Sequence, residues 1–400
     1  MTYNVKSVRS HFPQLVDGAA HFDGPGGSQT PDVVADAIRA ALVSPLSNRG
    51  QTTQAERNSE SIVGGARRAM ADLLNAPSEA IVFGRSMTQL TYDFSRTLAK
   101  NWGPGDEVVV TRLDHDANIR PWVQAAESVG ATVRWVDFDR TTAELTAADV
   151  ANALSSRTVL AAVTGASNLL GTRPDLGEIV SAIHQAGALA YIDGVHLTPH
   201  ASVDVAAIDA DFFGCSPYKF LGPHCGAIAG KPEVLEGLAP DKLLPSTAVV
   251  PERFEFGTLP YELLAGTEAA VDFLADLDPG AAVGRREKLV SSMSSLEAYE
   301  DELRVVLESR LAELPGIKLY GHASQRTPTL LFSLDGKESA SVYEHLGSVG
   351  VNAPAGSFYA LEASRWIGLG DTGAVRVGLA PYTDEGDLDR LLEGLKTFAA

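Results

Sequence analysis

Cysteine is scarce in this sequence and long apolar runs are missing, and both absences narrow what the protein can be. The 400 residues include two cysteines, Cys215 and Cys225, which we expect to be small buried apolar side chains rather than a disulfide. No apolar run approaches the ~20 residues that a membrane-spanning helix needs. Residues 1–15 also lack the apolar centre of a signal peptide. The sequence therefore predicts a cytoplasmic protein that does not insert into a membrane.

Basic residues are also in deficit. Asp and Glu number 51 against 32 Lys and Arg, which gives a formal net charge of −19. A surface this acidic repels phosphate backbones and anionic lipids, so nucleic acids and anionic membranes are not expected as partners. Hydrophobic residues make up 45% and charged residues 21%, as in soluble globular proteins. A chain of 400 residues is too long for one simple core, so we expect two domains.

Two nucleotide-binding motifs are absent as well. No G-x-G-x-x-G follows the first strand-like run, and no phosphate loop ending in GK[ST] occurs. A nucleotide-binding α/β protein is therefore the least favoured interpretation. The sequence contains no internal repeat, and it predicts no metal site.

Short apolar runs alternate with helical patterns up to residue 215. This alternation predicts parallel strands that are joined by crossover helices. We expect the first long helix to begin at Pro31, with Thr30 as its cap. The predicted strands cover residues 79–84, 106–114, 131–139, 158–168, 188–193 and 210–215, and the predicted helices include 53–74, 85–102 and 175–186.

The pattern changes near residue 280. A charged helix is expected over residues 285–314, and shorter strands and helices follow it to the C-terminus, which is typical of a smaller α+β domain. The predicted organisation is an N-terminal arm at 1–30, a large domain at 31–280 and a small domain at 281–400.

Two charged residues stand where a parallel sheet would present them to a ligand. Asp193 ends the apolar run ALAYID, and Lys219 closely follows the run ADFFGC. Ligands of open α/β sheets bind at the carboxyl edge, where both side chains would lie. An amine and a carboxylate at that edge suit a pyridine cofactor, because the amine can bind its aldehyde as a Schiff base while the carboxylate faces the ring nitrogen.

The segments DGVH and SPYKFLGPH resemble the cofactor segment of class V aminotransferases, a fold-type I family that uses pyridoxal 5′-phosphate (PLP). Within this family the sequence is most similar to the cysteine desulfurase-like and isopenicillin N epimerase-like proteins, from about Phe22 to the C-terminus. The resemblance implies an α/β fold with a mostly parallel, seven-stranded-type α/β/α large domain and a smaller C-terminal α+β domain. It also implies a homodimer with shared active sites.

The resemblance assigns catalytic roles to three residues. Lys219 would carry the cofactor and then remove the α-proton of an amino-acid substrate. Asp193 would keep the pyridine nitrogen protonated, which makes the ring a better electron sink. His115, in the segment LDHDANIRPW, would stack on the ring.

The cofactor phosphate would bind at a strand-to-helix turn formed by Ser86, Met87 and Thr88, because free backbone N–H groups at a helix start attract an anion. Other positions match cofactor-binding elements of the family: Asn168 and His196 near the phenolic oxygen, Ser216 and Tyr218 beside Lys219, and Gly257 and Thr258, which would reach the phosphate of the neighbouring subunit.

Three residues are candidates for contact with the substrate. Arg376, in AVRVGLAPYT, would hold the α-carboxylate with two parallel hydrogen bonds. Tyr359, with Phe358 beside it, suggests a closed wall of the pocket. Arg49 would contact the substrate from the partner subunit, although its segment is also typical of a loop that caps the next helix.

One departure from the family bears on the reaction. Cysteine desulfurases use a mobile cysteine, but the matching loop at 351–366 has Ser357, Phe358 and Tyr359 at that place, and no cysteine occurs beyond Cys225. The sequence therefore favours Cα-proton chemistry, with β-elimination at sulfur, a C–S lyase reaction, slightly ahead. Transamination, cysteine desulfuration and epimerisation stay open as alternatives, and so does a binding protein on the same fold without catalysis.

Overall fold

The computed structural model describes residues 3–15 and 18–399. A seven-stranded sheet forms its centre, in the order β2-β8-β7-β6-β5-β3-β4. The strands in that order are Ile81–Gly84, Gly226–Gly230, Phe212–Cys215, Leu189–Asp193, Thr158–Thr164, Glu107–Thr111 and Thr132–Val136. Strands β3 to β7 pair in parallel, whereas β8 is antiparallel to both β2 and β7. The predicted mostly parallel α/β sheet is confirmed.

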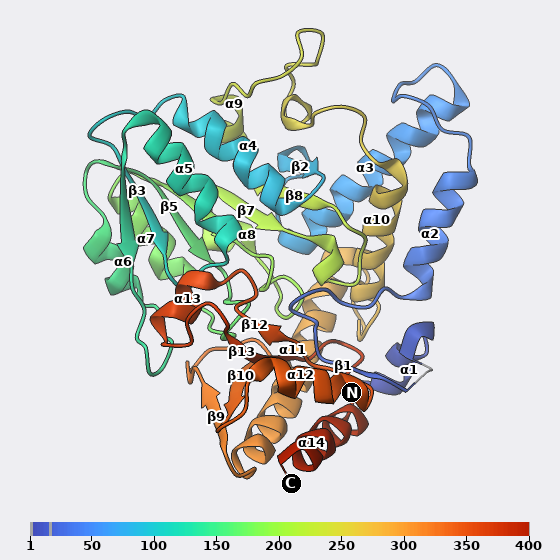
Figure 1. The fold of residues 1–400 in the computed structure, drawn as a ribbon. Coiled ribbons are helices and arrows are strands. Elements are labelled where there is room, and N and C mark those ends of the chain that lie inside the picture. The colour runs from blue at the N-terminus through green and yellow to red at the C-terminus, as the bar shows by residue number, and fades with distance from the viewer. Residues whose placement is uncertain (1–2, 16–17, 400) are drawn as a thin grey trace.

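Helices cover both faces of this sheet, because alternate residues of each strand point to opposite faces (Figure 1). Val108 and Val110 pack with the helices α4 (Met87–Ala99) and α5 (Arg120–Val129). Val109 between them belongs to the core on the other face. That second core contains residues of α3 (Gln54–Leu74), α7 (Leu176–Gln185) and α10 (Tyr261–Ala275), and the shorter α6 (Ala147–Ala153) and α8 (Val205–Ile208) also contribute to it.

A second, antiparallel sheet lies in the C-terminal part of the chain, coloured orange to red in Figure 1. Its order is β12-β13-β10-β9, from Ala355–Gly356, Ala374–Gly378, Thr329–Leu334 and Ile317–Tyr320. The helices α11 (Arg285–Ala312), α12 (Ser339–Ser348) and α14 (Glu385–Ala399) pack on it. The remaining helices of the described residues are α1 (Val5–Arg9), α2 (Asp32–Val43), α9 (Pro232–Glu236) and α13 (Leu361–Trp366).

The N-terminal arm joins the C-terminal part. Strand β1 (Ala20–His21) pairs in parallel with β11 (Val351–Asn352), and Phe22 is fully buried in the C-terminal core. We propose that residues 31–280 form the large domain and 281–400 the small domain, with an arm at 1–30 that contacts both: Phe12 lies in the core of the large part and Phe22 in that of the small part. The long helix α11 contributes Leu296 to the core of the large part and Leu303 to that of the small part, so it links the two.

Two local expectations are wrong. Helix α2 begins at Asp32 rather than at Pro31, and Thr30 does not cap it. The Asp32 carboxylate accepts from the Val33 N–H at 2.7 Å, and the Asp32 N–H donates to the His11 carbonyl at 2.8 Å, so the first amides have partners without Thr30. Strand β8 was not expected, because its sequence GAIAG lacks the alternation that marks a half-buried strand.

Gly226, at the start of β8, allows the turn before α4 to approach the sheet. A Cβ atom at Gly226 would lie 2.3 Å from the Met87 nitrogen and 2.3 Å from the Ser86 carbonyl carbon. Both are backbone atoms, so neither can rotate away. The position of the α4 N-terminus therefore depends on the absence of a side chain at Gly226.

We expect Gly226→Ala to lower the free energy of unfolding by at least about 1–3 kcal/mol, because the methyl group overpacks against backbone. Urea denaturation measures the change. Gly103→Ala is the matched control, since a Cβ atom there would meet nothing within 4 Å. Equal unfolding midpoints for the two variants would show that the turn can shift without cost.

Candidate active site

A cavity opens at the carboxyl edge of the seven-stranded sheet, where the turns after β2, β5, β6 and β7 meet. Ten of the predicted site residues line it: Ser86, Met87, Thr88, His115, Asn168, Asp193, His196, Ser216, Tyr218 and Lys219. Pro25, Ala117, Thr164, Ala166 and Val195 complete the lining. The structure thus brings together one carboxylate, one amine, two imidazoles and a helix N-terminus.

Asp193 is the last residue of β6, and its side chain is only 4% exposed. One carboxylate oxygen accepts from the Val195 N–H at 3.0 Å. Burial raises the pKa of Asp193 to about 6, and the Val195 N–H and the Lys219 charge oppose that rise. Above pH 6 the residue is therefore an anion in a site with little water, where it attracts a cationic partner.

Lys219 ends the 3₁₀ turn Pro217–Lys219 that follows β7. Its ammonium group donates a hydrogen bond to the Pro25 carbonyl, and it lies 4.9 Å from the centre of the Tyr218 ring. Burial and the nearby Arg376 charge lower the pKa of Lys219 to about 7, against the opposing effects of Asp23 and Asp193. An amine with this pKa exists in both protonation states at neutral pH.

His115 lies after β3, and its ring is held in one tautomer. The Ala117 N–H donates to His115 Nδ1 at 3.0 Å, so a neutral ring carries its proton on Nε2. Burial, together with the charges of Lys219 and Arg376, lowers the pKa of His115 to about 3. The ring is therefore neutral at physiological pH, which suits a flat face for stacking.

The turn before α4 forms an anion cradle. Ser86 is the N-cap, and its hydroxyl accepts from the Gln89 N–H at 3.1 Å. The N–H groups of Met87 and Thr88 belong to the first turn, which has no acceptor within the helix. Because these donors and the positive end of the helix dipole point to the cavity lined by the same residues, the turn can hold a phosphate group.

Two buried polar atoms at the cavity have no partner among the described residues, Asn168 Oδ1 and His196 Nδ1. The other polar atom of each of these two side chains has a partner in the protein. Asn168 Nδ2 donates to the Phe358 carbonyl at 2.9 Å, and His196 Nε2 lies 2.9 Å from Thr329 Oγ1. Orphaned buried polar atoms are rare, and a ligand with polar atoms of its own would satisfy them. Together with the anion cradle, this set fits PLP, which carries a phosphate, a ring nitrogen, a phenolic oxygen and an aldehyde.

Arg376 does not line this cavity, and its guanidinium already has partners within the protein. Its side chain is 1% exposed. Its Nη2 donates to Asp23 at 2.6 Å and its Nη1 donates to the Asn168 carbonyl at 3.1 Å. The guanidinium carbon lies 3.7 Å from the centre of the Phe358 ring. The sequence missed Asp23, because its neighbours FDGPGGSQTP indicate only a loop.

Tyr359 is not a wall of the cavity either, since 76% of the residue is exposed. Phe358 and Tyr359 both have left-handed backbone, with φ of 52° and 58°. Two hydrogen bonds hold this strained pair: Asn168 donates to the Phe358 carbonyl, and the Asp116 N–H donates to the Tyr359 carbonyl at 2.7 Å. The backbone of the loop at 351–366 is thus tied to residues next to the site.

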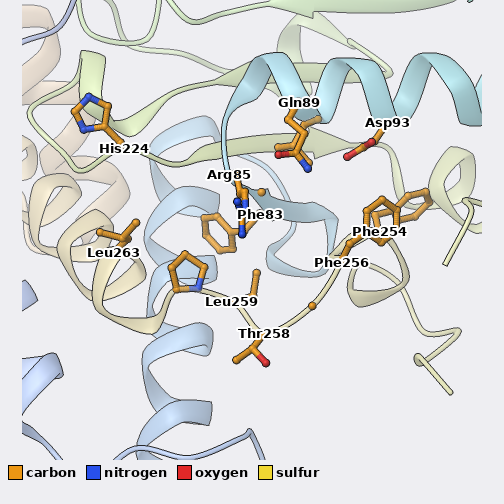
Figure 2. Close-up of a pocket in the computed structure, with 14 residues that line it drawn as sticks. Phe83, Arg85, Gln89, Asp93, His224, Phe254, Phe256, Thr258, Leu259 and Leu263 are labelled. Carbon is orange, nitrogen blue, oxygen red and sulfur yellow. The ribbon is translucent and has the colours of Figure 1, made fainter. Parts of the chain in front are cut away.

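Gly257 and Thr258 line a different hollow, which Figure 2 shows between the end of β2 and the segment before α10. Arg85 and His224 also line it. Neither Gly257 nor Thr258 lines the cavity that contains Lys219 in the same chain. A contact of these residues with the cofactor would therefore require a second subunit. Arg49 also lies outside the cavity that contains Lys219. It forms ion pairs with Glu60 at 2.9 Å and with Glu252 at 2.6 Å.

The two cysteines are poor nucleophiles. Cys215 is fully buried in β7 and Cys225 is 1% exposed, which confirms that both are buried side chains without a disulfide. Burial raises the pKa of the Cys215 thiol well above its usual range and that of Cys225 to about 11. Neither thiol is ionised at neutral pH.

Comparisons with known proteins identify the class of this fold and site. The family model described as Aminotransferase class-V matches residues 20–391. The uncharacterized protein MT3887 of Mycobacterium tuberculosis is 34% identical over 99% of both chains, and the aminotransferase-like protein FGM3 of Gibberella zeae is 30% identical over 99% of this chain and 98% of that protein. The cysteine desulfurase CsdA of Escherichia coli superposes with a TM-score of 0.86 at 25% identity, over 99% of this chain and 98% of that one.

The chain belongs to the class V aminotransferase family. It is a PLP-dependent enzyme of fold type I, as the sequence predicted. Within residues 3–15 and 18–399, every helix is too short or too polar to span a bilayer.

The lowered pKa of Lys219 can be tested on protein without bound cofactor. At pH 7 about half of the Lys219 amines would be neutral, against fewer than about 1 in 1,000 for an ordinary lysine. We expect pulse labelling with acetic anhydride to modify Lys219 with a midpoint near pH 7. Peptide mass spectrometry measures the labelled fraction of Lys219 at each pH.

Asp193→Asn removes a charge that raises the pKa of Lys219, so it should move the labelling midpoint to lower pH. A midpoint above pH 9 in the unmutated protein would contradict the electrostatics of the site.

Proposed function

We propose that this enzyme catalyses β-elimination on a cysteine-derived amino acid. The net reaction converts an S-substituted cysteine and water to pyruvate, ammonia and a thiol, with no change in overall oxidation state. The observation that carries the proposal is the combination of the Asp193–Lys219 pair with a loop at 351–366 that is held by two hydrogen bonds to its backbone and contains no thiol. Relatives that include cysteine desulfurases support the sulfur-containing substrate class.

The chain's own residues divide the work in a definite way. Lys219 would hold the cofactor aldehyde, and its pKa of about 7 suits an amine that takes and returns a proton at the substrate α-carbon. Asp193 would keep the ring nitrogen protonated, and the neutral ring of His115 would cover one face of the pyridine. When bound, PLP supplies an electron sink for the pair left behind by that proton.

The phosphate would lie on the N–H groups of Ser86, Met87 and Thr88, with Ser216 and Tyr218 as side-chain donors. Asn168 Oδ1 and His196 Nδ1, which have no partner within the described part of the chain, would face the phenolic oxygen region. The Thr327 and Thr329 hydroxyls lie 3.0 Å and 2.9 Å from His196 Nε2, so they can donate to that nitrogen while Nδ1 donates to the ligand.

The substrate carboxylate would bind at Arg376, whose Nε has no partner among the described residues. We also propose a homodimer with shared active sites, because Gly257 and Thr258 lie away from the cavity of their own chain. In that assembly they would approach the phosphate of the partner. Arg49 and Tyr359 would lie at the entrance rather than at the reacting atoms.

Cysteine desulfuration is the less favoured reaction. It needs a thiolate that attacks the substrate sulfur and retains it as a persulfide. Both cysteines of this chain are buried with raised thiol pKa values, and the loop at 351–366 holds Phe358 and Tyr359 but no cysteine. Transamination and epimerisation share the Cα-proton step and differ only in where the proton returns.

Lys219→Ala should remove the visible absorbance band of the bound cofactor and lower pyruvate release from S-substituted cysteines by at least about 10³-fold, because carrier and base are lost together. Lys396→Ala, on the exposed surface of α14, is the control and should match the unmutated enzyme. An absorbance scan with coupled assays for pyruvate and ammonia measures both. Formation of a keto acid without release of ammonia or thiol would favour transamination instead.

Cys215→Ala and Cys225→Ala should each retain pyruvate release and the absorbance band, since neither thiol takes part. The measurement is the product ratio from cysteine, with sulfide, alanine and pyruvate assayed in the same tubes. Alanine with sulfide, abolished by either variant, would overturn elimination and establish desulfuration.

A further inference from the structure

The N-terminal arm contacts both cationic residues of the site. The Asp23 carboxylate accepts from Arg376 Nη2 at 2.6 Å, and two residues later the Pro25 carbonyl accepts from the Lys219 ammonium. Arg376 is the residue to which the substrate carboxylate is assigned above, and Lys219 is the residue proposed to hold the cofactor aldehyde. The arm therefore places a carboxylate and a carbonyl of its own where the substrate has to bind.

Backbone pairing fixes the arm in this position. The Gly378 N–H donates to the Phe22 carbonyl at 2.8 Å, and Asp23 forms a parallel bridge with Gly378. Arg376 precedes Gly378 by two residues on β13, so both lie on the same face of the strand. The Asp23 carboxylate then fits beneath Gly26, where a Cβ atom would lie 2.3 Å from both of its oxygens.

Asp23 leaves Arg376 few free donors. Nη2 donates to Asp23, Nη1 donates to the Asn168 carbonyl, and the Phe358 ring covers one face of the guanidinium. Nε alone has no partner among the described residues. A carboxylate bound in the usual two-pronged way needs two adjacent nitrogens, so a substrate has to share or displace Asp23.

We propose that Asp23 is a specificity-determining residue: it competes for Arg376 with the carboxylate of any incoming ligand. A simple carboxylic acid only replaces the Asp23 carboxylate at Arg376 with its own carboxylate, and the negative charge of Asp23 stays close by. An α-amino acid also engages the site through its amino group, and this second attachment offsets the competition. Asp23 thus excludes carboxylates that lack the amino group, because its own negative charge repels them. The inference rests on the proposed function, in which Arg376 receives the substrate carboxylate.

The test compares binding of propionate, which has no amino group, with that of its uncharged amide, propionamide. Asp23→Asn keeps the size of the side chain but removes its charge. In the cofactor-loaded enzyme we expect Asp23→Asn to bind propionate at least about tenfold more tightly than the unmutated enzyme, while propionamide binding stays the same. Isothermal titration calorimetry measures both affinities. Equal propionate affinity in the two proteins would overturn the inference.

A second readout does not involve the reaction. Asp23→Asn leaves the buried Arg376 charge without its partner, so its melting temperature should fall and should recover as propionate is added. The unmutated protein should show no such rescue. Rescue of both proteins to the same extent would overturn the competition.

Gly26→Ala tests position rather than charge. Its methyl group would push the Asp23 carboxylate off Arg376 while leaving the carboxylate in the protein, so propionate should again bind more tightly. Gly27→Ala is the matched control in the same loop, because its Cβ atom would make only an ordinary contact, 3.4 Å from Tyr218. Tighter propionate binding in Gly27→Ala and not in Gly26→Ala would contradict the proposal.

Failure of the inference can be told from failure of the proposed function. Loss of elimination products in the unmutated enzyme, with the propionate differences intact, would reject the reaction and keep the competition at Arg376. Unchanged propionate binding in Asp23→Asn and Gly26→Ala, with elimination intact, would reject the role of Asp23 and leave the proposed reaction standing. In the double variant Asp23→Asn/Arg376→Gln the gain in propionate affinity should disappear, and a persistent gain would contradict Arg376 as the carboxylate partner.

Discussion

The parallel pairing of β6 with β7 brings together the two groups on which the chemistry depends. Ile192 pairs with Phe213 and Asp193 with Gly214, so the carboxylate of Asp193 emerges level with the end of the neighbouring strand. Gly194 completes this arrangement: its N–H donates to the Gly214 carbonyl at 2.8 Å, and a Cβ atom there would lie 2.0 Å from the Phe213 ring. The chain can therefore turn tightly over β7, and one 3₁₀ turn then carries Lys219 to the same edge. The N-terminus of α4, the ring of His115 and the Asn168 side chain line the same cavity as these two groups.

Burial gives these groups their reactivity. Removal from water raises the pKa of Asp193 and lowers those of Lys219 and His115, because in each case the charged form is the one that loses solvation. The net effect is an anion, an amine that is poised between two protonation states, and a neutral ring. The fold thereby prepares general acid–base chemistry near pH 7 with ordinary side chains. The same burial makes Cys215 and Cys225 inert, although both flank Lys219 in the sequence.

Much of this could be predicted from the sequence where one local pattern determines one element. The alternation of apolar runs and helices was enough for the parallel sheet, and the pattern around Ser86 was enough for the strand-to-helix turn that lines the cavity. The sequence failed where a contact joins distant segments. Strand β8 has no pattern of its own and forms because its backbone pairs with β2 and β7. Arg376 was predicted to hold a carboxylate, but the sequence around it did not reveal that Asp23, near the other end of the chain, pairs with it.

The sequence by itself was enough to identify the class of cofactor, because the segments around Asp193 and Lys219 resemble the cofactor segment of class V aminotransferases. It also determined that no cysteine stands in the loop at 351–366. Only the tertiary structure decided which of these groups are free to react. Whether a charge is solvated, paired or covered depends on residues far away in the chain, such as Asp23 and Pro25 of the arm and Phe358 of the C-terminal loop. These contacts form only when the arm, the sheet and the C-terminal part pack together, and the local sequence around Lys219 and Arg376 contains no trace of them.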